Sequence, residues 1–173
     1  MVFHEARTLL PILLNPDFAR IGLIGSGDAL ARREGLLVAA GVEPVRLTPE
    51  SPVEGLSVLF VAGLDPDTSA AWAKRARAAG VLVNIEDVPE LCDFHIPAIV
   101  RRGDLVFSVS TKGRSPALAR RLREWLETNF GPEWDARLQE LGALRDRLRA
   151  EGIRGGALAD QVHGVIAQKG WLK

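Results

Sequence analysis

Carboxylates that could exchange protons with a substrate are concentrated near the middle of the chain. They directly follow the apolar run at residues 81–83 and are Glu86, Asp87, Glu90 and Asp93. A carboxylate at the end of a buried strand can serve as a general base. The same residues can equally be turn or helix-capping acids. Residue type and spacing alone therefore leave both interpretations open.

A second group of chemically useful residues follows the apolar run Leu105–Val109. Its sequence is Ser110-Thr111-Lys112-Gly113-Arg114-Ser115, and Pro116 comes next. Ser115 can cap a helix and Pro116 suits the first helical position, where its missing N–H costs nothing. Two cations, hydroxyl groups and free N–H groups at a positive helix end favour an anionic ligand. An ordinary capped helix after a strand explains the same pattern.

A glycine turn near the N-terminus has the context of a dinucleotide-binding motif. Ile21–Ile24 predicts a short buried strand, Gly25-Ser26-Gly27 a tight turn, and Asp28–Ala40 a helix. In such a motif the glycines let the backbone approach a pyrophosphate, which sits at the helix N-terminus. The third motif position is Leu30 instead of glycine or alanine, so the motif is incomplete.

Two later segments could complete a nucleotide site. Glu50 lies 23 positions after Gly27, about where an acid would hold the adenosine ribose. Arg46 nearby would instead favour a 2′-phosphate. Gly63-Leu64 follows the apolar run Leu56–Ala62, and ligands bind at the carboxyl ends of strands in doubly wound sheets.

Alternating elements predict an α/β fold with a Rossmann-like, doubly wound parallel sheet. Besides Ile21–Ile24, the expected strands are Val42–Leu47, Leu56–Ala62, Val81–Ile85 and Leu105–Ser110. Further helices are expected over Thr68–Ala79 and Ser115–Asn129. Leu91–Arg101 contains Pro97, which allows at most a short or broken helix. Leu9–Leu14 predicts an extended segment packed on the sheet edge.

The pattern changes to helices alone after residue 132. Apolar residues from Trp134 to Leu148 recur at steps of three and four, and Ala157–Ala167 predicts a weaker helix. Such an apolar seam must be buried on its own sheet or on another subunit. We expect a nucleotide-binding domain over residues 1–112, followed by a helical dimerisation and substrate-side segment over 113–173.

Composition excludes several classes of protein. The 173 residues carry 22 basic and 22 acidic side chains, which argues against a general nucleic-acid binder. The single cysteine, Cys92, excludes an intrachain disulfide, fits a reducing cytoplasm, and is expected to be a buried, inert thiol. No signal peptide or membrane-spanning run is expected.

Residues 83–127 closely resemble the precorrin-2 dehydrogenase family, which includes the N-terminal part of siroheme synthase. Family members typically show V-N-V-V-D-D-P-E-L-C-D-F, then P-A-I-V-R-R, then S-T-G-G-x-S-P-A-L-A-R-x-L-R. This chain has V-N-I-E-D-V-P-E-L-C-D-F, P-A-I-V-R-R and S-T-K-G-R-S-P-A-L-A-R-R-L-R. A looser resemblance covers nearly the whole chain.

The resemblance implies oxidation of precorrin-2 to sirohydrochlorin with NAD as cofactor, by a homodimer. Some relatives also insert ferrous iron. Asp87 matches the family's important aspartate and is the candidate general base, and no residue is assigned to a metal. The implied cofactor-binding residues are Gly25, Ser26, Gly27, Asp28, Ala29, Glu50, Gly63 and Leu64. The implied substrate-binding residues are Asn84, Ser110, Thr111, Lys112, Arg114 and Ser115.

Three positions depart from the family pattern and keep other functions open. Leu30 and Leu64 replace a small and a polar residue, and Lys112 replaces a common glycine. A regulatory module that binds NAD without chemistry, or a scaffold that has lost the cofactor, would tolerate such changes. The regulatory module gives no reason for a basic S-T-K-G-R-S-P loop beside an acidic cluster. Iron insertion has no separate motif.

Overall fold

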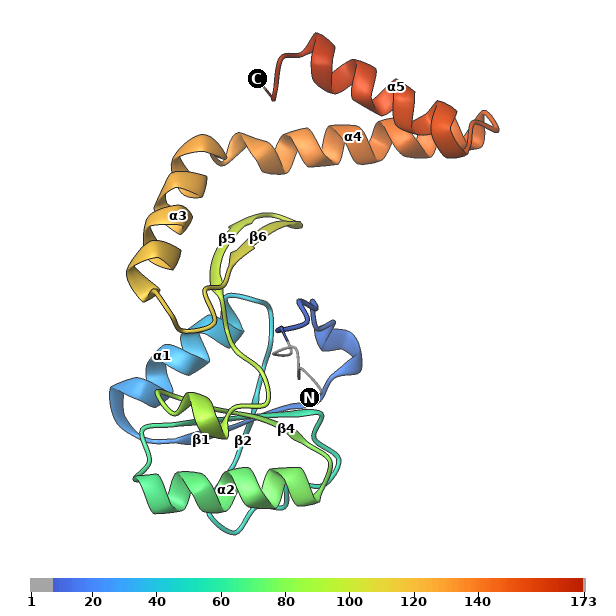
Figure 1. Ribbon diagram of the computed structural model, residues 1–173. Helices are drawn as coiled ribbons and strands as arrows, with labels where there is room; N and C mark the ends of the chain where they lie inside the picture. The colour runs from blue at the N-terminus through green and yellow to red at the C-terminus, as the bar shows by residue number, and fades with distance from the viewer. Residues whose placement is uncertain (1–7, 173) are drawn as a thin grey trace, which may run out of the picture. The chain divides into compact units, whose positions relative to one another are not determined.

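The computed structural model describes residues 8–172, and its contacts divide the chain into two compact units (Figure 1). They are Met1–Ile96 and Pro97–Lys173. The division lies before the predicted limit at residue 112, because the strands that follow Pro97 pack on the later helices. Within residues 8–172, no helix is long and apolar enough to cross a membrane.

The first unit is a four-stranded parallel sheet, which confirms the predicted α/β fold. Its strands are β1 (Ile21–Gly25), β2 (Val45–Arg46), β3 (Val58–Ala62) and β4 (Leu82–Ile85). Their order is β2-β1-β3-β4. Because the chain leaves β1 toward β2 and later returns to the other side of β1, the order switches between β1 and β3. Ligands of doubly wound sheets bind at the carboxyl ends of strands at such a switch point.

Two helices cover opposite faces of this sheet (Figure 1). They are α1 (Gly27–Val38) and α2 (Pro66–Ala78). Alternate strand residues pack toward them: Leu23 and Phe60 join the core under α1, whereas Leu59 and Val61 join the core under α2. Two short 3₁₀ turns, η1 (Pro16–Phe18) and η2 (Pro89–Leu91), complete the unit.

The second unit begins with an antiparallel hairpin and continues as three helices. The hairpin strands are β5 (Ala98–Arg102) and β6 (Leu105–Val109). The helices are α3 (Pro116–Asn129), α4 (Glu133–Ala150) and α5 (Gly155–Gln168). Arg102 fixes the end of α3, because its Nε donates to the carbonyl of Phe130 at 2.7 Å.

Two predicted elements were wrong. Leu105–Ser110 does not form a fifth parallel strand, because β6 pairs antiparallel with β5. The predicted broken helix at Leu91–Arg101 is replaced by the end of η2, an irregular stretch and β5. Gly103 has a φ of 57° and opens the two-residue turn between the strands. Gly-Asp in such a turn is a hairpin signal.

The extended segment Leu9–Leu14 forms no strand and does not pack on the sheet edge as predicted. It has no regular secondary structure, and Leu10 and Leu13 are 82% and 80% exposed. An apolar run without alternation or a hydrogen-bonded neighbour cannot indicate which surface covers it.

Candidate functional site

The glycine turn after β1 is held tightly against the end of β3. The backbone N–H of Ser26 donates to the carbonyl of Ala62 at 3.0 Å. A Cβ on Gly25 would lie 1.8 Å from that oxygen, and a Cβ on Gly63 would lie 2.3 Å from the carbonyl of Ser26. Glycine is therefore required at both positions by backbone packing. Two of the predicted cofactor residues, Gly25 in the turn and Gly63 after β3, thus allow the turn to pack against the end of β3.

The N-terminus of α1 is open. Ser26 is the N-cap residue, but its side chain makes no capping hydrogen bond to the helix. Its hydroxyl donates instead to the carbonyl of Gly63 at 2.6 Å. Gly27 has a φ of 61°, and a Cβ built on it would meet no atom within 4 Å. A helix N-terminus without a side-chain cap and with space beside it can accept an anion such as a phosphate.

Asp28 and Ala29, the next predicted cofactor residues, lie in the first turn of α1. Asp28 is exposed and Ala29 is partly buried in the first turn of α1. Leu30 packs on the core under α1, and Leu64 packs on the core under α2. Both leucines that depart from the family pattern therefore pack in the hydrophobic core.

Glu50 lies in an exposed loop whose backbone is held by hydrogen bonds on both sides of it. The turn closes with a 3.0 Å hydrogen bond from the N–H of Ser51 to the carbonyl of Thr48. Arg75 of α2 donates to the carbonyls of Pro49 and Ser51. The loop thus presents the Glu50 carboxylate to solvent after β2 from a fixed backbone.

Arg46 of β2 is already engaged with a carboxylate. Its Nε donates to Oε1 of Glu34 at 2.8 Å, and its Nη2 pairs with the second carboxylate oxygen. Such two-point pairing occupies the guanidinium group and its charge. A phosphate at this position would have to compete with Glu34.

Asp87 sits at the tip of the turn that follows β4. The turn spans residues 85–88 and closes with a 3.4 Å hydrogen bond from the N–H of Val88 to the carbonyl of Ile85. Asp87 is exposed and has a φ of 62°, in the left-handed region that aspartate and asparagine tolerate better than most residues. Its carboxylate is therefore presented to solvent at the carboxyl end of a parallel strand.

Asn84 lies inside the first unit. It is only 6% exposed, and its Nδ2 donates to the carbonyl of Phe94 at 2.9 Å. This bond ties the chain after η2 to β4. The observed contacts therefore give Asn84 a place in fixing this loop, and its predicted contact with substrate stays a prediction.

The basic loop between β6 and α3 is held by local hydrogen bonds from backbone N–H groups to side-chain oxygens. Ser115 caps α3, with its Oγ accepting from the N–H of Leu118 at 3.3 Å. Thr111 Oγ1 accepts from the N–H of Ser115 at 3.2 Å, and Ser110 Oγ accepts from the N–H of Lys112 at 3.3 Å. Lys112 itself has a φ of 54°. The side chains of Ser110, Lys112 and Arg114 are exposed.

Apart from Glu50 on its exposed loop, the candidate residues thus form three local groups. The turn after β1 and the end of β3 are in direct contact, and the Asp87 turn joins the same sheet edge, because the N–H of Glu86 donates to the carbonyl of Val61 at 2.9 Å. The basic loop belongs to the second unit. Within residues 8–172, no group of three or more His, Cys, Asp or Glu side chains is arranged to hold a metal ion.

Sequence reasoning missed an ion pair beside the candidate site. Arg32 of α1 lies 3.7 Å from the Glu86 carboxylate, which links the helix to the end of β4. A helix residue and a strand-end residue so far apart in sequence give no local pattern, so no periodicity could have indicated this pair.

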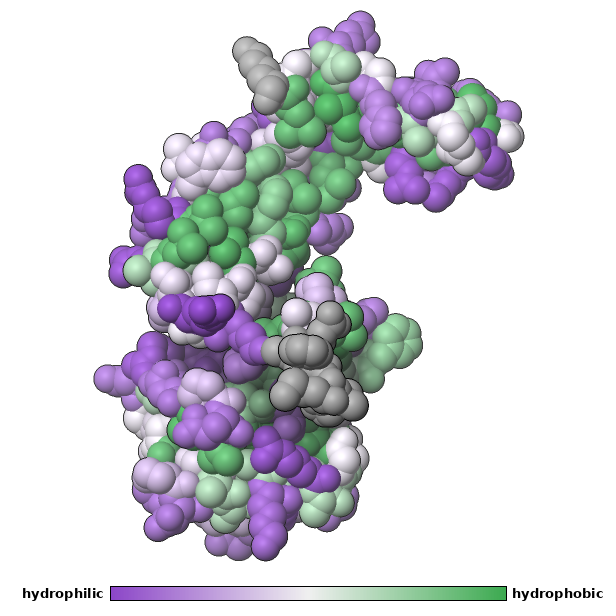
Figure 2. All heavy atoms as spheres, viewed as in Figure 1, coloured by the Kyte–Doolittle hydropathy of each residue, from purple (hydrophilic) through white to green (hydrophobic). Residues whose placement is uncertain are grey.

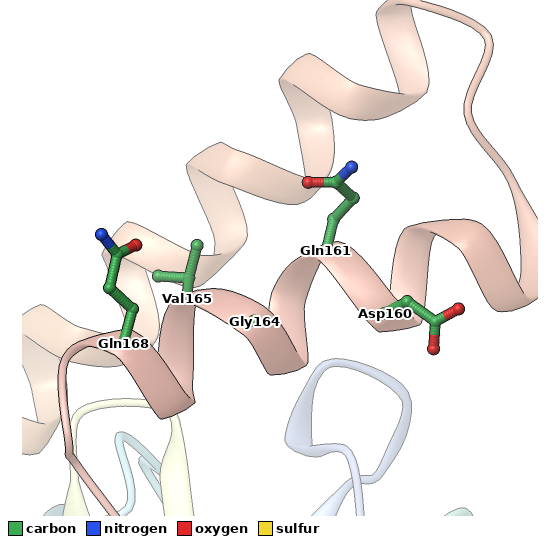
Figure 3. A pocket seen from close by; sticks show the side chains of 5 residues that line it. All are labelled: Asp160, Gln161, Gly164, Val165 and Gln168. Atoms are coloured by element: carbon green, nitrogen blue, oxygen red, sulfur yellow. The ribbon is translucent and has the colours of Figure 1, made fainter.

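A hollow on α5 is no candidate for the chemistry described above. Figure 3 shows its five lining residues, all from that one helix: Asp160, Gln161, Gly164, Val165 and Gln168. It offers a single carboxylate and neither a cation nor a glycine turn.

Comparison with known proteins fits this geometry. Residues 45–98 match a family model described as "Putative NAD(P)-binding". The siroheme synthase of Methylococcus capsulatus is 32% identical over 163 residues, which cover 81% of this chain and 34% of that protein. The siroheme synthase of Nitrosococcus oceani is 33% identical over 171 residues, covering 84% and 36%. The chain is homologous to part of siroheme synthase.

Two further matches, one to a shorter stretch of a relative and one to a solved structure, agree with this relationship. The siroheme biosynthesis protein met8 of Schizosaccharomyces pombe is 32% identical over 96 residues, covering 56% of this chain and 36% of that protein. A solved structure named "SirC, precorrin-2 dehydrogenase" matches with a TM-score of 0.72 at 19% identity, covering 91% of this chain and 89% of that one. The motif-based resemblance and the fold are thereby confirmed. The chain spans about a third of the length of the siroheme synthases that it matches.

Proposed function

We propose that this protein oxidises precorrin-2 to sirohydrochlorin in siroheme biosynthesis, with NAD as hydride acceptor. One observation carries the proposal: the N-terminus of α1 is left without a side-chain cap, beside open space at Gly27, in a chain homologous to siroheme synthase. The glycine turn fits the pyrophosphate of a dinucleotide, because backbone N–H groups and the helix dipole favour phosphate there.

The reaction removes two hydrogens from the macrocycle. When bound, NAD supplies the chemistry of accepting a hydride. The second hydrogen leaves as a proton, and the Asp87 carboxylate is the base that we propose to receive it. Its exposed position at the end of β4 supports this role, because a parallel strand ends there on the same edge as the glycine turn.

We propose NAD in preference to NADP. Glu50 presents a carboxylate from an anchored loop after β2, where it can hold the hydroxyls of the adenosine ribose. Arg46, the cation that could accept a 2′-phosphate, is paired with Glu34. A 2′-phosphate near this loop would therefore be repelled by the Glu50 carboxylate, while the charge of Arg46 is already paired with Glu34.

The basic loop before α3 suits the eight carboxylates of precorrin-2. Lys112 and Arg114 supply cations, and the hydroxyls of Ser110, Thr111 and Ser115 can donate hydrogen bonds. The exposure of the Lys112 and Arg114 side chains supports contact with a large polyanion.

We also propose that the protein works as a homodimer, in the cytoplasm. Leu118, Leu122 and Trp125 form an apolar stripe on α3 and are 51%, 40% and 56% exposed. Figure 2 shows apolar side chains gathered over α3. A second copy that covers this stripe would remove it from water.

The protein's single cysteine, Cys92, is a free thiol, and this suits the reducing conditions of the cytoplasm.

The test is an anaerobic assay of purified protein with precorrin-2 and either NAD or NADP. We expect the sirohydrochlorin absorption to develop with NAD, and a parallel assay with ferrous iron reports whether siroheme follows. The discriminating variant is Asp87→Asn, because asparagine tolerates the left-handed φ and keeps the turn. We expect it to lower kcat by about a hundredfold or more, since it cannot accept the proton.

Glu90→Gln is the matched control, because Glu90 is an exposed acid in η2 a few residues away. It should keep wild-type kcat. A catalytically normal Asp87→Asn enzyme would refute the proposed base. Wild-type protein that binds NADH without turnover would identify a regulatory module, and protein that binds neither ligand would identify a scaffold.

A further inference from the structure

The turn that carries Asp87 is held by the thiol of Cys92 at both of its ends. Cys92 Sγ lies 3.1 Å from the carbonyl oxygen of Ile85 and 3.3 Å from that of Val88. The N–H of Ile85 also donates to this sulfur at 3.3 Å. Ile85 and Val88 are the first and last residues of the turn, so a single side chain spans its base.

Cys92 is itself fixed independently of the turn. The next residue, Asp93, pairs with the edge strand: its N–H donates to the carbonyl of Val83 at 2.8 Å, and its Oδ2 accepts from the N–H of Val83 at 3.0 Å. Asp93 also forms an ion pair with Arg77 of α2 at 2.8 Å. The Asn84 amide reaches both the sulfur, at 3.6 Å, and the carbonyl of Phe94.

The turn needs this support. The left-handed region is unfavourable for residues other than glycine, although less so for aspartate, and Asp87 adopts it with a φ of 62°. The hydrogen bond that closes the turn is long, at 3.4 Å. Strained backbone persists only where the surrounding contacts determine it.

The chemistry of the thiol fits a hydrogen-bonding role. Burial raises the pKa of Cys92, while the hydrogen bond with Ile85 acts in the opposite direction. The protonated thiol can donate to a carbonyl, and a neutral sulfur is a poor nucleophile. Both properties favour a holding function over a reactive one.

We propose that Cys92 is a positioning residue that fixes the Asp87 carboxylate by holding both ends of its turn. The L-C-D-F motif would thus act on the reaction through backbone geometry. The effect on kcat rests on the proposed function. The holding of the turn rests on the observed contacts alone.

The kinetic test compares Cys92→Ala, Cys92→Ser and Val53→Ala. We expect Cys92→Ala to lower kcat about tenfold, which corresponds to the loss of roughly one hydrogen bond. KM for NAD should stay within about twofold, because the sulfur does not contact the β1–α1 turn. Cys92→Ser should recover most of kcat, since its hydroxyl, like the thiol, can donate its one proton to a carbonyl and accept from the N–H of Ile85.

Val53→Ala controls for general loosening of the core. Val53 is fully buried in the same core against which Cys92 packs. It should lower stability and leave kcat unchanged. A wild-type kcat in Cys92→Ala, or an equal loss of kcat in Val53→Ala, would overturn the inference.

Hydrogen exchange of the amides at residues 85–88 provides a readout that needs no activity. We expect selectively faster exchange of these amides in Cys92→Ala than in Val53→Ala. If the wild type fails to oxidise precorrin-2 but this difference is seen, the proposed function fails and the holding role stands. Equal exchange in both variants would refute the holding role whatever the enzyme does.

Discussion

The two helices that flank the parallel sheet begin in opposite ways. α1 and α2 each follow directly after a central strand, at the same edge. Asp65, the N-cap of α2, accepts a hydrogen bond from the N–H of Thr68 at 2.9 Å, and Pro66 removes one further N–H. Ser26, the N-cap of α1, turns its hydroxyl to the carbonyl of Gly63.

We propose that this difference distinguishes a helix start that only needs to be stable from one that binds the dinucleotide. The N-terminus of α2 is satisfied by its own chain and carries an acid, so an anion gains little there. The N-terminus of α1 lacks a side-chain cap and has open space beside Gly27. Ser26 and Asp65 are both small polar N-cap residues, and only the structure shows that their side chains bond to different partners.

The largest effect is expected when the contact between the α1 turn and β3 is broken. Gly25→Ala places a methyl group 1.8 Å from the backbone oxygen of Ala62, which cannot move without disrupting the sheet. We expect loss of several kcal/mol of stability, on the order of a severe overpacking mutation. Urea unfolding measures it.

Gly35→Ala is the matched control in the same helix. Gly35 has no atom within 4 Å of an added Cβ, so alanine should stabilise the protein by about 0.5–1 kcal/mol. Equal stability of the two variants would contradict the close approach of β1 and β3.

An intermediate effect is expected when α1 is made to resemble α2. Ser26→Asp introduces a carboxylate that can cap the helix and repel a phosphate. We expect affinity for NAD to fall by about tenfold or more, with the fold retained. Calorimetric titration measures the affinity, and Ser26→Ala separates the loss of the hydroxyl from the added charge. Unchanged affinity in Ser26→Asp would place the dinucleotide elsewhere.

The smallest effect is expected at α2. Asp65→Ala removes the cap and should lower Tm slightly without changing affinity for NAD. The hydrogen bonds from Thr68 lower the pKa of Asp65 from its ordinary 3.8. The folded state thus favours the charged form, so this stabilisation is present above pH 3.8 and is lost as pH falls through the lowered pKa. Thermal unfolding against pH should show the wild type and the variant converging in acid; a constant difference would contradict the charged cap.

Much of the first unit follows from local sequence. Continuous apolar runs predicted β1, β3 and β4 to within two residues at either end, because strands buried on both faces read as unbroken apolar segments. Ser115-Pro116 likewise predicted the start of α3. The glycine turn was found from the strand and helix around it.

Sequence reasoning missed contacts that residue composition alone does not reveal. The apolar run of β6 has the composition of a buried parallel strand, and the Gly103-Asp104 turn that signals its pairing with β5 was overlooked. Cys92 was expected to be buried and inert, but its contacts with both ends of the Asp87 turn follow from the path of the chain after η2. The hydroxyl of Ser26 could have faced its own helix, and only the position of Gly63 decides that it does not.

The start of α1, and not the start of α2, is where we propose that the dinucleotide binds. Titration of isotope-labelled protein with NAD, followed by the backbone amide signals, tests this directly. We predict that the largest shifts occur at Gly27, Asp28 and Ala29, with little change at Asp67 and Thr68. Large shifts at the start of α2, or none at the start of α1 under saturating NAD, would contradict it.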